Sequence, residues 1–226
     1  MSDDPTRRRR DPAGTRQAIL DAAVALLAKD GAEAVSLSEV AHRAGVNRGT
    51  AYQHFQTREK LIEATAQWVS DRMFHAVFGD PAAIGDRDVE HVDMVDVTER
   101  LAAFAMENPE LCRVWLLQIL SAPEPSRDPF WREYAGSIGR FSQTDLAQPN
   151  IDVEVLSVLT LAAHFLWPVW ARAHSRGKAE RTRLAHRFAH EMLRFSMYGS
   201  LRPDKLAEVA ERLENAGPAP RLRLIK

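Results

Sequence analysis

Residues 45–55 read GVNRGTAYQHF, a short stretch that combines two glycines, a polar centre and two aromatic side chains three residues apart. Gly45 can adopt the positive φ that a tight turn between two helices requires. Asn47 is a good N-cap, so the sequence predicts a short helix over 47–53. The stretch is therefore typical of the turn and second helix of a helix-turn-helix unit.

The flanking sequence supplies the other helices of such a unit. Ser36, with Glu39 three residues later, forms a capping-box pattern that starts a short helix over 36–43. An amphipathic helix over 15–29 comes before it, and Thr57 caps the longer helix that follows. These elements predict a small helical module braced by its first helix.

The second helix carries side chains suited to DNA. In helix-turn-helix units this helix lies in the major groove. Arg48 is the natural base reader, because a guanidinium pairs with two acceptors of guanine, and Gln53 can pair in the same way with adenine. Thr50 and Tyr52 bring hydroxyls suited to phosphate oxygens. Gly49 is costly inside a helix, so its presence indicates close approach of the backbone to DNA or to a neighbouring helix.

The order of these residues resembles the tetracycline-repressor (TetR) family. The matching segments are AAVALLAKDG, SLSEVAHRAGVNRGTAYQHF and TREKLI, which extend over about residues 15–65. Three positions depart from the family pattern, since Asn47 replaces the usual serine, Ala51 a larger apolar residue and Arg58 the usual lysine. Asparagine caps a helix as well as serine does, and arginine keeps the charge, so DNA binding is expected to survive these changes.

The resemblance implies a homodimeric transcriptional regulator that binds double-stranded DNA. Because most members of the family repress transcription, the resemblance also implies a repressor, which a small apolar or aromatic effector releases from a near-palindromic operator. Carried over position by position, the resemblance implies DNA contacts from Ser38, Arg48, Gly49, Thr50, Tyr52, Gln53, His54, Arg58 and Lys60. For Lys60, a solvated position on the helix surface explains the residue equally well.

Helical spacing of apolar residues continues along the rest of the chain, with no alternating strand pattern, so we expect an all-α fold. An N-terminal three-helix DNA-binding domain is expected to join a larger helical domain. The predicted later helices are 88–107, 109–121, 129–146, 152–173, 180–198 and 204–215. The expected divisions are a basic arm over 1–14, the DNA-binding domain over 15–60 and an effector-binding and dimerisation domain over 61–226.

The larger domain is rich in aromatic residues, which either line a pocket for an apolar molecule or fill an ordinary core. The candidate effector contacts are Phe104, Trp115, Trp131, Phe141, His164 and Trp167. Two late helices carry apolar residues at i, i+4 type spacings and are expected to form a four-helix bundle with a second copy. The candidate dimer contacts are Leu161, Phe165, Leu184, Phe188, Met192 and Phe195.

Other functional classes have little support in the sequence. The formal net charge is −1, and a single cysteine, Cys112, excludes an internal disulfide and a multi-cysteine metal site. His186 and His190 have the spacing of a metal pair, but the order of a zinc-protease motif is absent, as are phosphate-binding loops and nucleophile elbows. We therefore expect no enzyme, no cofactor and no metal. The alternative is a helical ligand-carrying or interaction protein without specific DNA binding.

Two segments of the chain bear on its location, the N-terminus and one apolar run. MSDDPTRRRRDPAG lacks the apolar region of a signal peptide, so a cytoplasmic location is expected. Arg7 to Arg10 are interpreted either as a solvated tail or as an arm that contacts DNA. The apolar run over 155–171 is marginal for a membrane span and contains a histidine and a proline, so a helix buried by its own core and by a second subunit is preferred.

Overall fold

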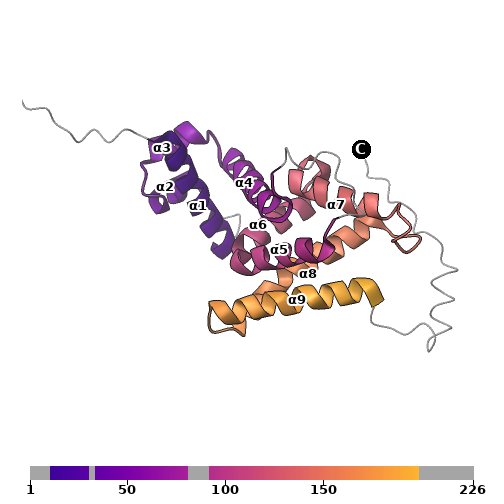
Figure 1. The fold of residues 1–226 in the computed structure, drawn as a ribbon. Coiled ribbons are helices and arrows are strands. Elements are labelled where there is room, and N and C mark those ends of the chain that lie inside the picture. Colours follow the sequence, from indigo (N-terminus) through magenta and orange to yellow (C-terminus); the bar gives the residue numbers. More distant parts are fainter. Residues whose placement is uncertain (1–10, 31–33, 81–91, 199–226) are drawn as a thin grey trace, which may run out of the picture. The chain divides into compact units, whose positions relative to one another are not determined.

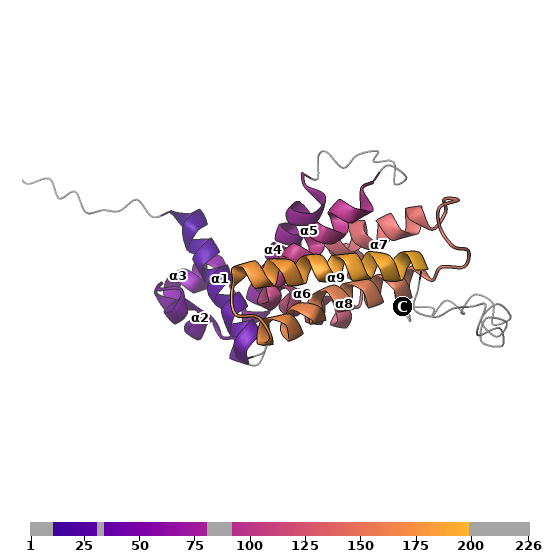
Figure 2. The same ribbon diagram turned by 60° about the horizontal axis from the view of Figure 1, so that its bottom comes forward.

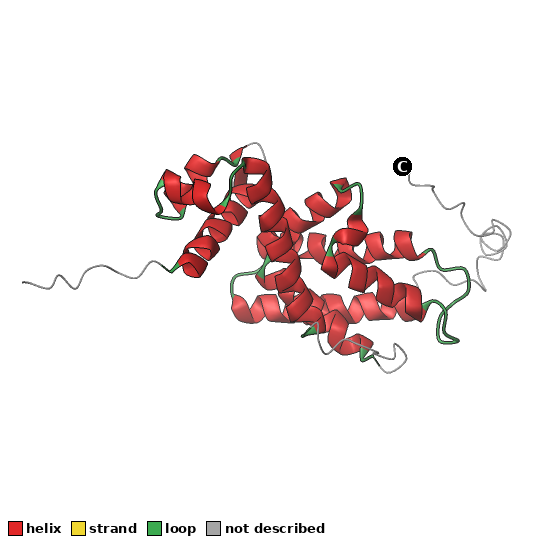
Figure 3. Ribbon diagram, turned by 90° about the horizontal axis from the view of Figure 1, so that it is seen from above, coloured by secondary structure: helices red, strands yellow, loops and turns green. Residues whose placement is uncertain are grey.

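The computed structural model describes residues 11–30, 34–80 and 92–198, and these residues form α-helices, a short 3-10 helix and no strand (Figure 1). Figure 3 shows the same helices joined by short loops. The expected all-α fold is therefore confirmed. The predicted helix over 204–215 and the residues Arg7 to Arg10 lie outside the described residues.

The chain divides into two compact units. The first is Met1–Arg72 together with Glu110–Ser121, and the second is Met73–Pro109 together with Ala122–Lys226. The boundary predicted after residue 60 falls inside one helix, α4 (Arg58–Phe78), which contributes its first part to one unit and its last turns to the other. Each unit has its own core.

The first unit contains α1 (Pro12–Asp30), α2 (Leu37–Arg43), α3 (Arg48–His54), the first part of α4, and α6 (Pro109–Ser121). The predicted caps are confirmed: Ser36 Oγ accepts from the Glu39 amide at 3.2 Å, and Thr57 Oγ1 accepts from the Lys60 amide at 3.2 Å. These caps satisfy amides that would otherwise lack partners, and they fix where α2 and α4 begin.

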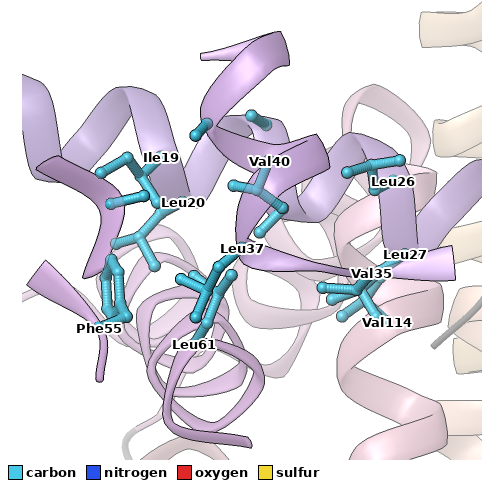
Figure 4. Close-up of a cluster of buried hydrophobic side chains, with 14 of the residues drawn as sticks. Ile19, Leu20, Leu26, Leu27, Val35, Leu37, Val40, Phe55, Leu61 and Val114 are labelled. Atoms are coloured by element: carbon cyan, nitrogen blue, oxygen red, sulfur yellow. The ribbon is translucent and has the colours of Figure 1, made fainter. Parts of the chain in front are cut away.

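An apolar cluster holds the first unit together (Figure 4). It joins α1, α2, the start of α4 and α6, while α3 contributes a single small side chain, Ala51, which is fully buried. Phe55, directly after α3, adds a large side chain to the same core. Among the members are Ile19, Leu20, Leu26, Leu27, Val35, Leu37, Val40, Leu61 and Val114. Because α3 is anchored through so little of its own surface, most of its side chains remain available outside the core.

The turn between α2 and α3 depends on one glycine. Gly45 has φ of 67°, a left-handed conformation, and a Cβ added there would meet no atom within 4 Å. The need for glycine is therefore conformational, not a matter of space. The amide of Val46 donates to the carbonyl of Ala41 at 3.0 Å, which closes the turn and directs the chain into α3.

The second unit contains α5 (Met94–Glu107), the 3-10 helix η4 (Pro125–Arg127), α7 (Pro129–Phe141), α8 (Val153–Ala173) and α9 (Lys178–Tyr198). Helix α5 packs on α8 and α9, and α7 packs on α8. Figure 2 shows α9 lying along α8. The indole Nε1 of Trp167 donates to the carbonyl of Leu184 at 3.2 Å and ties these two helices together.

Two helix ends differ from their predicted positions. Helix α7 was expected to reach residue 146, but it ends at Phe141, where Ser142 Oγ donates to Gly139 O at 2.8 Å and Thr144 Oγ1 donates to Phe141 O at 2.8 Å. Hydroxyls of this kind compete with the helical bonding pattern and favour turns. Helix α5 begins at Met94, later than expected, because the side chain of Asp93 caps it.

Candidate nucleic-acid interface

Helix α3 presents almost all of its side chains away from the core. Arg48, Gly49, Tyr52 and Gln53 are exposed, and only Ala51 is buried. Thr50 and His54 are half-buried. The structure therefore places the six candidate contact residues of this helix on one short element of two turns, and those with the longest polar side chains face solvent.

Asn47 orders the start of α3 through two hydrogen bonds. Its Oδ1 accepts from the amide of Thr50 at 2.7 Å and from the hydroxyl of Thr50 at 2.9 Å. A phosphate oxygen can only accept, so Thr50 must turn its hydroxyl away from Asn47 before it can donate to DNA. The hydroxyl bond to Asn47 and the predicted phosphate contact of Thr50 thus compete for the same proton, while the capping bond uses the Thr50 amide and is unaffected.

Arg48 and Tyr52 form a pair across one turn of α3. Arg48 Nη2 donates to the Tyr52 hydroxyl at 3.4 Å, and the guanidinium carbon lies 5.4 Å from the centroid of the tyrosine ring. The tyrosine oxygen is the acceptor in this bond, so its own proton is free for an external acceptor. A guanidinium already held over a ring loses less side-chain freedom when it binds a base.

The local charge around this pair is positive. No acidic residue occurs between Glu39 and Glu59 in the sequence, whereas Arg43, Arg48 and Arg58 fall in that interval. Among the described residues Arg48 has no carboxylate partner, while Arg43 is bonded to Glu39 at 3.0 Å and Arg58 lies 3.8 Å from Glu59. The balanced charge of the whole chain therefore conceals a segment whose field favours an anion.

Gly49 has no intramolecular reason to be glycine. Its φ lies outside the left-handed region, and an added Cβ would meet only Asn47 Oδ1 at 3.4 Å, an ordinary contact. A glycine inside a helix nevertheless costs about 1 kcal/mol relative to alanine. The exposed position and the absent side chain fit close approach by a second molecule.

The flanking helices contribute candidates that also support the fold. Arg58 Nε donates to the carbonyl of Val35 at 2.9 Å, which holds the start of α4 against the segment before α2. Lys60 Nζ lies 2.7 Å from a carboxylate oxygen of Glu63, and both side chains are exposed. Ser38 is exposed near the start of α2. Arg58 therefore has a structural role beside its predicted contact with phosphate.

Sequence reasoning missed Arg16 on α1. This residue is exposed, and its guanidinium carbon lies 5.2 Å from the centroid of the Phe55 ring, beside the end of α3. The apolar spacing of α1 indicates only its inward face and gives no reason to single out the polar residue next to that face. Its position makes Arg16 a further candidate for contact with phosphate.

The candidate effector residues fall into separate places. Trp115 is 1% exposed and belongs to the first unit, whereas the other five belong to the second. His164 and Trp167 both contact the ring of Phe188, with centroids 5.0 Å and 5.6 Å apart. In the described part of the chain, Phe104, Trp131 and Phe141 have no ring contact with this group.

Two of the candidate dimer residues lie on α8, and their burial contradicts the prediction that they contact a second copy. Leu161 and Phe165 are 0% and 2% exposed, so they belong to the core of a single chain and cannot face a partner. The periodic pattern identified an apolar face, but it was the inward one. The exposed apolar residues of α8 are Val155, Leu159, Leu166, Val169 and Trp170. On α9, Phe195 is exposed, and Leu184, Phe188 and Met192 are half-buried.

By length and composition alone, α8 is also long and apolar enough to cross a membrane. Core helices of soluble proteins meet the same criteria. Helix α8 packs against α5, α7 and α9 of the same unit, so its apolar composition has a structural use within this fold.

Comparison with known sequences identifies relatives of the first unit. A family model described as bacterial regulatory proteins of the tetR family matches residues 19–65. The chain is similar to the HTH-type transcriptional regulator AcrR of Shigella flexneri, with 34% identity over 100 residues, 41% of this chain and 46% of AcrR. It is also similar to the HTH-type transcriptional repressor Rv3405c of Mycobacterium tuberculosis, with 33% identity over 89 residues, 38% of this chain and 47% of that protein. These matches span about half the length of the curated relatives.

Solved structures extend the similarity of fold over most of the chain. A TetR family regulator from Shewanella sp. PV-4 has a TM-score of 0.63 at 22% identity and covers 83% of this chain and 99% of its own. A TetR family regulator from Marinobacter aquaeolei VT8 has a TM-score of 0.61 at 23% identity, with 78% and 94% covered. At this level of identity the likeness is one of fold.

Proposed function

We propose, from the premise that this chain belongs to the TetR family of bacterial regulatory proteins through residues 19–65, that it is a homodimeric repressor of transcription. It binds a near-palindromic operator in double-stranded DNA through α3. The observation that carries the proposal is the outward face of α3, where Arg48 is held against Tyr52 and no carboxylate neutralises it within the described residues.

The side chains divide into base readers and phosphate contacts. Arg48 reads guanine by bidentate pairing with O6 and N7, and Gln53 reads adenine. Tyr52, with its hydroxyl proton free, donates to a phosphate oxygen, and Gly49 lets the helix backbone approach the groove closely. The remaining contacts set the register on the phosphate backbone without reading sequence, and they come from Ser38, Thr50, His54, Arg58, Lys60 and Arg16.

Dimerisation is proposed through the exposed faces of α8 and α9. Leu159, Leu166 and Trp170 are 61%, 62% and 49% exposed in the single chain, which is a large apolar surface for a monomer to leave in water. A second copy related by a two-fold axis covers the same surface on both chains. Two α3 helices then face half-sites about one helical turn of DNA apart.

Release from DNA is proposed to follow binding of a small apolar or aromatic molecule to the second unit. A ligand that binds one conformation of the dimer more tightly than the other shifts the population toward it. Operator affinity then falls by the same coupling free energy with which DNA weakens ligand binding. Thermal stabilisation by a compound without any loss of operator binding would count against this part of the proposal.

Selection from a random duplex library tests the DNA-binding proposal. The retained DNA is sequenced, and recovered sites are measured at several salt concentrations with the wild type, Arg48→Ala and Tyr52→Ala. Arg127→Ala is the matched control, because it removes the same charge from a side chain in the second unit that is 78% exposed. An enriched near-palindrome that only the two α3 variants lose supports the proposal. Absence of any enriched sequence, with residual binding lost at moderate salt, would overturn it.

Analytical ultracentrifugation tests the proposed dimer face. Leu159 on α8 and Leu146 in the loop after α7 are both 61% exposed, so Leu146→Asp serves as a control for Leu159→Asp. We expect Leu159→Asp to raise the dimer dissociation constant at least about tenfold and Leu146→Asp to leave it unchanged. Equal dimerisation of both variants would place the interface elsewhere.

A further inference from the structure

A histidine lies in the interior of the second unit with a defined tautomer. His164 on α8 is 4% exposed, and its Nδ1 lies 2.7 Å from the carbonyl oxygen of Thr160. A carbonyl oxygen can only accept, so Nδ1 carries the proton and donates it. Burial lowers the pKa of His164 to about 4, so the ring is neutral near pH 7. The other nitrogen, Nε2, therefore holds a lone pair and can only accept.

Nε2 is buried and has no hydrogen-bond partner among the described residues. Two hydroxyls belong to the same hydrogen-bonded cluster, and both already donate their protons elsewhere. The Tyr134 hydroxyl donates to Thr160 Oγ1 at 2.8 Å, and Thr160 Oγ1 donates to Leu156 O at 2.7 Å. This cluster therefore has no spare donor for His164. A buried acceptor without a donor carries a desolvation penalty, and a ligand that donates a hydrogen bond to it removes that penalty.

The surroundings of this acceptor are aromatic. The ring of Phe188 meets His164 edge to face at 5.0 Å and stacks on Trp167 at 5.6 Å. Tyr134, which leads into the polar cluster, stacks on Phe130 at 5.9 Å. Helix α7 supplies part of this surface, and of its 13 residues only Phe130 is buried. The unpaired acceptor is therefore surrounded by aromatic rings from α7, α8 and α9.

We infer that His164 is the polar recognition group of the effector site, and that the effector is an uncharged, flat, mostly apolar molecule carrying an O–H or N–H donor. The inference rests on the proposed release by a small apolar molecule and specifies its chemistry. A carboxylate has no proton to give to Nε2 at neutral pH. A molecule whose polar groups are all acceptors leaves Nε2 unpaired and gains only apolar contact.

Isothermal titration calorimetry of the full chain without DNA tests this inference. Three pairs of probes differ only by methylation of the donor: indole and 1-methylindole, 2-naphthol and 2-methoxynaphthalene, and 4-phenylphenol and 4-methoxybiphenyl. We expect the donor-bearing member of at least one pair to bind about tenfold more tightly than its methylated partner. We also expect 2-naphthoate to bind more weakly than 2-naphthol.

Two variants separate hydrogen bonding from the bulk of the added methyl group. His164→Phe keeps a ring but removes the acceptor, so it should bind both members of a pair about equally. His164→Gln places an amide oxygen near the position of Nε2 and should keep part of the preference. Circular dichroism checks that each variant is folded, and the wild-type comparison stands without them.

Two results would overturn the inference. One is that no donor-bearing probe binds the wild type more tightly than its methylated partner. The other is that His164→Phe keeps the full preference, since the donor then pairs with another group. Because no DNA is present, failure here leaves the operator selection unaffected, and a failed selection leaves the calorimetry interpretable.

Discussion

The guanidinium of Arg48 lies over the ring of Tyr52, one turn further along α3, with its carbon 5.4 Å from the ring centroid and Nη2 3.4 Å from the hydroxyl. The pair is exposed, so its contribution to folding is small. The pair instead restricts the side chain of Arg48, so the guanidinium already has a defined position in the protein without DNA. Preorganisation of this kind lowers the entropic cost of binding.

Two substitutions of Tyr52 separate the support of Arg48 from the contact with phosphate. Tyr52→Phe keeps the ring and removes the hydroxyl, whereas Tyr52→Ala removes both. We expect Tyr52→Ala to weaken operator binding by about 1–3 kcal/mol and Tyr52→Phe by less. Fluorescence anisotropy with the selected site measures both. Equal losses would mean that the ring contributes nothing to the position of Arg48.

Gly49→Ala should move stability and DNA affinity in opposite directions. The added methyl group improves helix propensity by at most about 1 kcal/mol, the value for a helix interior, because Gly49 is the second residue of α3, and it makes only an ordinary contact with Asn47 Oδ1 at 3.4 Å. Urea denaturation should therefore show a more stable protein. Operator affinity should fall, because the methyl group occupies space needed for close approach. A variant that gains stability at unchanged affinity would show that the glycine is not at the DNA surface.

Asn47→Ala should destabilise the protein and disturb α3. The substitution removes the acceptor of the Thr50 amide, a bond of 2.7 Å, and loss of such a cap costs about 0.5–2 kcal/mol. Asn47→Ser restores a capping oxygen and should recover most of the stability. Thermal unfolding compares the three proteins. If serine is no better than alanine, the bond is not what holds the start of the helix.

His164 predicts a specific dependence of stability on pH. Burial holds its pKa in the folded chain at about 4, below the ordinary 6.5, so between these values the unfolded chain binds a proton that the folded chain does not. The free energy of unfolding therefore falls as the pH drops from 7 toward 4.5, by up to about 1.4 kcal/mol per pH unit. Urea denaturation at pH 7, 6 and 5 measures the slope. His164→Gln should be less steep by this amount, and an identical slope would contradict the neutral buried ring.

Cys112 should be inert in the folded protein. Its side chain is fully buried on α6, and burial raises the pKa of its thiol well above the usual range. Reactivity requires an accessible thiolate. Iodoacetamide should therefore leave the native chain unmodified and label one site in urea, which mass spectrometry of the intact protein detects. Rapid labelling under native conditions would show that α6 opens readily.

Local features of the fold were predictable because they depend on neighbours in sequence. The caps at Ser36, Asn47 and Thr57, and the positive φ of Gly45, follow from the chemistry of single side chains. The face of α3 that carries Arg48 and Tyr52 follows from helical geometry once the start of the helix is known. The contact of Arg16 with Phe55 joins α1 to the residue after α3, so it could not be predicted from either segment alone.

The buried face of α8 could not be predicted from the sequence. Apolar residues occur on most of its sides, so periodicity does not tell the inward face from the outward one. Leu161 and Phe165 were expected at an interface and are buried, while Leu159 and Leu166 are exposed. Which face turns inward is decided by packing against α5, α7 and α9, and that requires three-dimensional coordinates.

The stacked indoles of α8 have an optical consequence. The ring centroids of Trp167 and Trp170 are 5.0 Å apart with 25° between the planes, so their electronic transitions couple and contribute an exciton signal to circular dichroism. Trp170 is 49% exposed on the surface proposed to meet a second copy, whereas Trp167 is hydrogen-bonded to α9. Association through the proposed surface is therefore expected to change the environment of one coupled chromophore and to leave the other fixed. The stacked pair would then report the proposed assembly without any attached dye.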